Sequence, residues 1–183
     1  MKKLILTTLS FLLISCGSID ISAYKDNKPK LDLRTFFTGD LTAHGIIKNR
    51  SGQVIRYFNV EMNGHWSEEG VGTLAEKFVF DDESIEYRTW TFTPIVKNKT
   101  TQYLAKANDT VEPVEISIAG NAFFMNYDLL IDYQGEKLQV RIEDKMYLVN
   151  QTVMINESTM IKYGLDVGFI TLTIIKQASV DAS

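Results

Sequence analysis

The chain has 183 residues and a formal net charge of −4 at pH 7, from 19 basic and 23 acidic side chains. Its length supports one sizeable hydrophobic core. Its acidic balance lacks the basic footprint of a nucleic-acid-binding protein and argues against electrostatic docking on anionic lipid. We therefore expect no nucleic-acid partner.

The N-terminus has the pattern of a lipoprotein export signal. Two lysines precede an apolar run over residues 4–14, which is far shorter than the roughly 20 apolar residues that span a bilayer. The run ends in Leu-Ile-Ser-Cys, a lipobox whose last residue is Cys16, the single cysteine. This pattern predicts a signal peptide over residues 1–15 and lipidation of the Cys16 thiol. An ordinary signal peptide with an incidental cysteine is the alternative.

Cleavage of residues 1–15 removes two lysines and no acid, which takes the net charge from −4 to −6. The pattern resembles that of bacterial lipoproteins, whose N-terminal cysteine carries the acyl chains that hold the protein to the membrane. Gly17 stands where an aspartate retains enterobacterial lipoproteins at the inner membrane. The resemblance implies an outer-membrane anchor, with the protein facing the periplasm.

The mature chain divides into a tether and one folded domain. Residues 16–30 are polar and short of large apolar side chains, so we interpret them as the acylated N-terminus and a flexible tether. An apolar cluster over residues 31–37 precedes Gly39 and predicts a short helix that ends there. The folded domain is expected to run over residues 31–178.

Alternation of apolar and polar residues dominates the chain after Gly39. It is clear at residues 54–62, 138–142 and 170–174, and turn signals such as Ser51-Gly52 separate the runs. The spacing leaves no room for crossover helices, so the pattern predicts an all-β antiparallel meander. Closure into a lipocalin-like barrel would remove its open edges, and a two-sheet sandwich is the alternative. Residues 156–164 break the alternation and are expected to form a short helix.

Several short motifs occur in an order that is similar to a known bacterial lipoprotein family. They are Pro29 with Leu31-Asp32-Leu33, Phe36-Phe37 with Gly39, Arg50-Ser51-Gly52, Arg88 with Trp90, Gly120-Asn121-Ala122, Tyr127, and Met160 with Lys162 and Gly164. Together they resemble the family catalogued as domain of unknown function 3833, over almost the whole mature chain. The resemblance implies the envelope location and the lipocalin-like barrel. It brings no assigned activity, so it implies no catalytic residue.

One strand carries the best candidate for a binding site. Arg88, Trp90 and Phe92 are spaced two apart, so their side chains project from the same face of a strand. An arginine that points into a barrel must be paired, because an unpaired buried charge is very costly. Its partner is either an internal acid or the carboxylate or phosphate head of an amphiphile. Tyr127 is a further candidate for the lining of the same cavity.

The sequence offers little support for catalysis or metal binding. Its two histidines, His44 and His65, lie on different predicted strands, with no third ligand at a suitable spacing. The Gly-x-Ser-x-Gly context of a hydrolase nucleophile is missing, and acylation would consume the one thiol. We therefore expect no catalytic residue, no metal ion and no cofactor.

These features favour a non-catalytic lipoprotein that binds a hydrophobic or amphiphilic small ligand near the outer membrane. The proposed ligand-binding residues are Arg88, Trp90, Phe92 and Tyr127. A structural or protein-interaction lipoprotein with a filled barrel is the alternative, since barrels of about eight strands lie on the boundary between a packed interior and a single-ligand cavity.

Overall fold

A computed structural model describes residues 19–97, 100–133 and 135–178. Nearly all of them belong to one antiparallel sheet, so the predicted all-β meander is confirmed. The strands, in chain order, are β1 (Gly39–Asn49), β2 (Val54–Trp66), β3 (Gly72–Phe80), β4 (Ile85–Lys97), β5 (Thr100–Ala107), β6 (Val114–Glu115), β7 (Ser117–Ala119), β8 (Ala122–Tyr133), β9 (Glu136–Leu148), β10 (Val153–Lys162) and β11 (Leu165–Lys176). Two short helical turns precede them, the 3-10 turn η1 (Ile21–Tyr24) and the single α-turn α1 (Leu33–Phe36).

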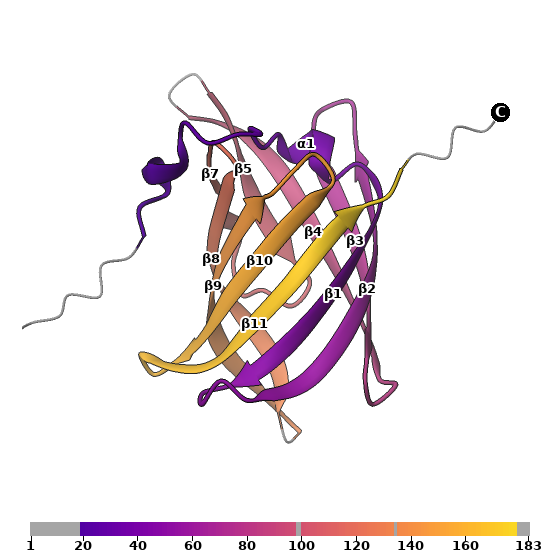
Figure 1. The fold of residues 1–183 in the computed structure, drawn as a ribbon, viewed down its shortest axis with the longest axis vertical. Helices are drawn as coiled ribbons and strands as arrows, with labels where there is room; N and C mark the ends of the chain where they lie inside the picture. Colours follow the sequence, from indigo (N-terminus) through magenta and orange to yellow (C-terminus); the bar gives the residue numbers. More distant parts are fainter. Residues whose placement is uncertain (1–18, 98–99, 134, 179–183) are drawn as a thin grey trace, which may run out of the picture.

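The eleven strands curl into a nearly closed barrel, as predicted, and the sandwich alternative does not form (Figure 1). The strand order is β6-β5-β4-β3-β2-β1-β11-β10-β9-β8-β7, so β1 and β11 pair and bring the two ends of the meander together. β5 and β8 face each other across a seam. β6 and β7 follow each other in the chain and pair with β5 and β8, so they span one part of this seam. In the other part, irregular chain closes it through a β-bridge from Thr110 to Leu129 and bonds from the Leu130 amide to the Asp109 carbonyl and from the Val111 amide to the Asp128 carbonyl, 2.8 and 2.9 Å long.

Turn chemistry sets the hairpins where the sequence predicts them. Ser51-Gly52 joins β1 to β2, and Glu69-Gly70 joins β2 to β3. Gly52 and Gly70 both have positive φ, a conformation that side chains with a Cβ rarely adopt. Tight hairpins of this kind fix the register of the strands that they join.

The predicted helix over residues 156–164 does not form, because this segment continues β10 into its hairpin with β11. The alternation is hidden in the sequence because two of the inward positions are polar. Asn156 and Ser158 are both buried, and each bonds to Asp144 of β9. A buried acid on the neighbouring strand therefore explains why polar residues occupy the inner face of β10.

The N-terminal segment lies along the barrel before the first strand begins. The Tyr24 ring of η1 packs against Phe124 and Tyr147, with ring centroids 5.8 and 5.4 Å away. The Leu31 amide then donates to the Gly120 carbonyl over 2.8 Å. A Cβ at Gly120 would lie 1.8 Å from the Tyr24 carbonyl oxygen, so the close approach requires glycine. Part of the segment assigned to the tether from sequence, around Tyr24 and Asn27, is thus in contact with the barrel.

The upper end of the barrel in Figure 1 is covered by α1. The predicted short helix is present here, with the Asp32 side chain accepting from the Thr35 amide as its N-cap. The Lys176 ammonium of β11 donates to three carbonyls around the end of α1, those of Thr35, Phe36 and Thr38. These bonds hold α1 across the barrel end.

Beneath α1, the upper end is filled by an aromatic group that we call the upper plug: Phe36, Phe37, Trp66 and Phe92. The Phe92 ring stacks on Trp66 and on Phe37, with centroids 6.0 and 6.2 Å apart. The Trp66 indole nitrogen donates to the Phe37 carbonyl over 3.4 Å. All four side chains are buried, so the upper end is sealed.

The lower end, where the hairpins β1–β2, β3–β4, β8–β9 and β10–β11 lie, is built differently (Figure 1). Phe58 and Phe80 are buried here, and the Arg56 guanidinium lies over the Phe80 ring, 3.6 Å from its centroid. Six other inward apolar side chains at this end are only partly buried. We call them the lower ring: Ile47, Phe78, Ile131, Leu138, Met160 and Ile170. Solvent therefore reaches apolar side chains at this end.

Candidate functional site

All four candidate residues from the sequence face the barrel interior. Arg88, Trp90 and Phe92 lie on the inner face of β4, as the alternation predicts, and Tyr127 faces inward from β8. The Trp90 and Tyr127 rings meet edge to face, with centroids 5.2 Å apart. Phe92 belongs to the upper plug, so the structure separates it from the other three. Cys16 lies outside the described residues.

Arg88 is paired inside the protein. Its Nε and Nη2 atoms both lie 2.8 Å from Oδ2 of Asp109, which comes from the seam segment after β5. The two side chains retain 22% and 25% of their accessible surface, although Arg88 points inward. Below Trp90, β4 has no partner in β5, so the pair lies next to the seam in a part of the interior that solvent reaches.

Asp144 is the centre of a second polar group on the inner face of β9. Its carboxylate accepts from Tyr127 Oη at 3.0 Å, from Asn156 Nδ2 at 3.2 Å and from Ser158 Oγ. Burial raises the pKa of Asp144, and these hydrogen bonds act against that increase because they stabilise the ionised form. Burial also raises the pKa of Tyr127 well above its ordinary value, so its hydroxyl remains the donor.

Glu76 of β3 lies directly opposite Arg88 in the register between β3 and β4. Its Oε2 atom is buried without a hydrogen-bond partner, and so is Oδ1 of Asp109. Burial raises the pKa of Glu76 to about 7, although the neighbouring Arg88 charge acts in the opposite direction. Glu76 therefore exchanges its proton near neutral pH.

These residues form one inward-facing group that we call the polar belt. Its members are Glu76, Arg88, Asp109, Tyr127, Asp144, Asn156 and Ser158. The belt contains three acids and one cation, and mutual electrostatic effects link the acids to Arg88. Together with the lower ring, it places polar and partly exposed apolar side chains in the same half of the interior.

Sequence reasoning missed most of the belt, although two members carry a signal. The alternation Leu138, Val140, Ile142 places the next inward side chain at Asp144, and Leu74 with Phe78 places Glu76 inward by the same rule. Asp109 carries no such signal, because it lies in the irregular seam segment.

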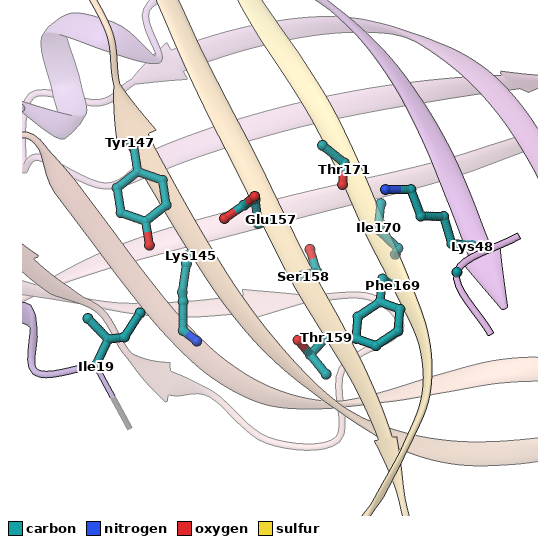
Figure 2. Close-up of a pocket in the computed structure, with 11 residues that line it drawn as sticks. Ile19, Lys48, Lys145, Tyr147, Glu157, Ser158, Thr159, Phe169, Ile170 and Thr171 are labelled. Carbon is teal, nitrogen blue, oxygen red and sulfur yellow. The ribbon is translucent and has the colours of Figure 1, made fainter. Parts of the chain in front are cut away.

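Two surface hollows lie on the outer wall rather than in the interior. The larger, about 430 Å³, crosses the outer faces of β9, β10, β11 and β1 (Figure 2). Ile19, Lys145 and Tyr147 line one side of it, and Lys48 and Phe169 line the other. A second hollow of about 330 Å³ lies on the outer faces of β1 to β4.

The two histidines do not come together. The His44 Nδ1 atom lies 2.7 Å from Oδ1 of Asn59, in the middle of β2 on the outer wall, and His65 lies farther along, near the end of β2. Among the residues that the structure describes, no group of three or more histidine, cysteine or acidic side chains could hold a metal ion. Within the same residues, no helix is long and apolar enough to cross a membrane.

Comparison with known sequences identifies the family. The sequence model of the family described as "Protein of unknown function (DUF3833)" matches residues 10–176. The chain therefore belongs to this family, and the resemblance carried by its motifs is confirmed. No curated protein matches the chain.

Two solved structures are similar in fold. One is the S-type phycobiliprotein lyase CPES from Guillardia theta, with a TM-score of 0.49 and 9% identity over 81% of this chain and 94% of the lyase. The other is EF1p2_mFAP2b bound to DFHBI, with a TM-score of 0.39 and 10% identity over 78% of this chain and 94% of that protein.

Proposed function

We propose that this member of the DUF3833 family is an envelope lipoprotein whose barrel binds an amphiphilic small molecule in the lower half of its interior. In this proposal the acylated Cys16 holds the protein to the outer membrane, facing the periplasm. The ligand's apolar chain contacts the lower ring, and its head group reaches the polar belt. Binding requires no chemical step.

The observation that carries the proposal is that the Arg88–Asp109 pair and the lower ring, in the same half of the barrel, both remain partly exposed. A barrel that serves only as a packed scaffold is expected to bury its inward apolar side chains completely, as the upper plug does. The lower ring remains partly exposed, and solvent still reaches the Arg88–Asp109 pair. Partly exposed apolar side chains that lead to a polar group are typical of ligand sites.

Arg88 pairs with an internal acid and does not bind an anionic head group in this proposal. Asp109 already satisfies two of its donors, so Arg88 is not a free receptor for an anionic head group. Its pairing with an internal acid is the alternative that the sequence left open. We propose that Arg88 positions Asp109 and lines the site.

The test uses the full chain carrying Cys16→Ser, which cannot be acylated, and native mass spectrometry with and without added dodecanol. We expect a bound small molecule in the parent chain and its loss in Leu138→Glu, which places a charge in the lower ring. Gln139→Glu is the matched control, because the adjacent side chain is exposed on the outer wall. Equal binding by both variants, or no ligand in the parent, would favour the interaction lipoprotein with a filled barrel.

The anchor has its own test. Cys16→Ser should move the protein from the membrane fraction to the soluble fraction, since stable anchoring depends on the acyl chains. Retention in the membrane pellet would show that another feature holds the protein there.

A further inference from the structure

We infer that the head group of the bound amphiphile is an organic cation, a primary ammonium group that the polar belt recognises through the carboxyl groups of Glu76 and Asp109. This inference rests on the proposed function and defines its ligand class. An ammonium head group takes the place of the carboxylate or phosphate head group that the sequence offered as a partner for Arg88.

The first argument is the charge balance of the belt. Glu76, Asp109 and Asp144 are acids, and Arg88 is the one cation among the belt residues. Asp109 neutralises Arg88 by direct pairing, and Asp144 is satisfied by three donors. Glu76 has no ion pair of its own and shares the Arg88 charge with Asp109, so the acids of the belt outnumber its cation. An anionic head group would meet further negative charge here, whereas a cation would balance it.

The second argument is the kind of hydrogen-bonding capacity that remains. The atoms without partners, Oε2 of Glu76 and Oδ1 of Asp109, are both carboxylate oxygens. Ionised carboxylates only accept hydrogen bonds, so a matching head group must donate. An ammonium group has three donors and no acceptor, and hydrogen bonds between ionised partners are about twice as strong as neutral ones.

The third argument separates an organic cation from a metal ion. The described residues contain no cluster of three or more ligating side chains that could hold a metal. The lower ring provides the apolar contact that a metal ion does not need but an alkyl ammonium does. The two halves of the site therefore fit the two halves of one amphiphile.

The titration of Glu76 links this binding to pH. The raised pKa of Glu76, about 7, reflects burial that the nearby Arg88 does not offset. The other titratable groups facing it, Asp109, Tyr127 and Asp144, include no further cation. A bound ammonium favours the ionised carboxylate, so ammonium affinity should rise as pH increases through 7. Alkyl amines stay protonated in this range, since ordinary amines titrate near about 10.4.

The experiment compares dodecylammonium, dodecanol and dodecanoate on the Cys16→Ser full chain, each below its micelle-forming concentration, by tryptophan fluorescence. The three share one chain and differ only in the head. We expect dodecylammonium to bind about tenfold more tightly than dodecanol, because its hydrogen bonds are charge-assisted. Dodecanoate should bind more weakly than dodecanol. From pH 6 to pH 8 the ammonium affinity should rise about fivefold, with dodecanol unchanged.

Glu76→Gln tests the residue itself, because it removes the charge and keeps the side-chain volume. It should bring dodecylammonium close to dodecanol and abolish the pH dependence. Glu61→Gln is the matched control, since Glu61 is exposed on the outer wall and pairs with Lys77. It should leave all three affinities unchanged. The pH series on the parent chain needs no variant, so it remains decisive if Glu76→Gln fails to fold.

The outcomes separate the two proposals. Equal binding of the three compounds would overturn the ammonium inference and leave the amphiphile function standing. Tightest binding of dodecanoate would also overturn it and identify Arg88 as an anion partner. Failure of all three to bind would overturn the proposed function as well.

Discussion

The upper and lower ends of the barrel are made by the same strands, yet only the upper end is sealed. Leu148, near the upper end of β9, retains 5% of its accessible surface, whereas Leu138, at the lower end of the same strand, is only partly buried. The difference comes from the chain outside the sheet. α1 and Phe37 cover the upper end and complete its core, whereas at the lower end the hairpin turns and the Arg56 side chain over Phe80 leave the lower ring partly exposed. A terminal segment that covers one mouth of the barrel therefore completes the core at that end alone.

The largest expected effect compares these two leucines. Leu148→Ala should lower the free energy of unfolding by about 2–5 kcal/mol, because the sealed end cannot collapse around the cavity. Leu138→Ala should cost about 1 kcal/mol, since its side chain is partly in water already. Urea unfolding monitored by tryptophan fluorescence measures both. Equal losses would mean that the lower end is as well packed as the upper.

The second prediction assigns the pH dependence of stability to the lower half. Glu76 titrates at 4.5 when unfolded and at about 7 when folded, so the unfolded chain binds fewer protons between these values. Stability should fall as pH rises through this window, and the raised pKa of Asp144 acts in the same direction.

At pH 8 we expect Glu76→Gln to be more stable than the parent chain by about 2–3 kcal/mol, with little difference at pH 4. Thermal unfolding at a series of pH values measures this. A parent chain whose stability does not decline above pH 5 would show that Glu76 is not desolvated.

The third prediction concerns the hydrogen bonds of the belt. Tyr127→Phe removes the 3.0 Å bond to Asp144 and leaves a buried carboxylate oxygen without that donor. We expect a loss of about 1–2 kcal/mol in the free energy of unfolding. Tyr57→Phe is the control, because the Tyr57 side chain is exposed on the outer wall and should change nothing. If Tyr127→Phe left the free energy of unfolding unchanged, Asp144 would be protonated and its carboxyl group would not depend on the Tyr127 hydroxyl as a donor.

The smallest effect is expected on the outer wall. Glu61→Gln removes the 3.1 Å ion pair with Lys77, in which the Glu61 side chain is 73% exposed. Solvent screens such pairs, so the change in stability should be within about 0.5 kcal/mol. Urea unfolding at low and high salt measures this change. A larger loss would mean that ion pairs on the outer wall contribute substantially to the free energy of unfolding.

Local periodicity was enough to predict the meander, because alternation and turn residues act over a few positions. The meander in turn predicted closure into a barrel, because closure removes the unpaired backbone groups at the two edges of a long antiparallel sheet. The periodicity also placed Arg88, Trp90 and Tyr127 on the inner faces of their strands.

The same rule failed where the interior is polar. The inward acid Asp144 makes Asn156 and Ser158 favourable on β10, and this pairing across strands is invisible in a local window. Asp109 reaches Arg88 from irregular chain 21 residues later, so only the folded seam reveals the pair. Contacts between charged and polar groups far apart in the sequence determine which polar residues occupy inward positions, and alternation does not predict them.

The bond from Leu31 to Gly120 and the packing of Tyr24 attach the N-terminal segment to the wall of the barrel. Ile19 lies beside Lys145 on the wall, and Cys16 stands three residues before it. Three residues extend at most about 11 Å. In the proposed lipoprotein, an acyl group on Cys16 would therefore hold the barrel close to the lipid surface, and a bound amphiphile would exchange directly with that surface.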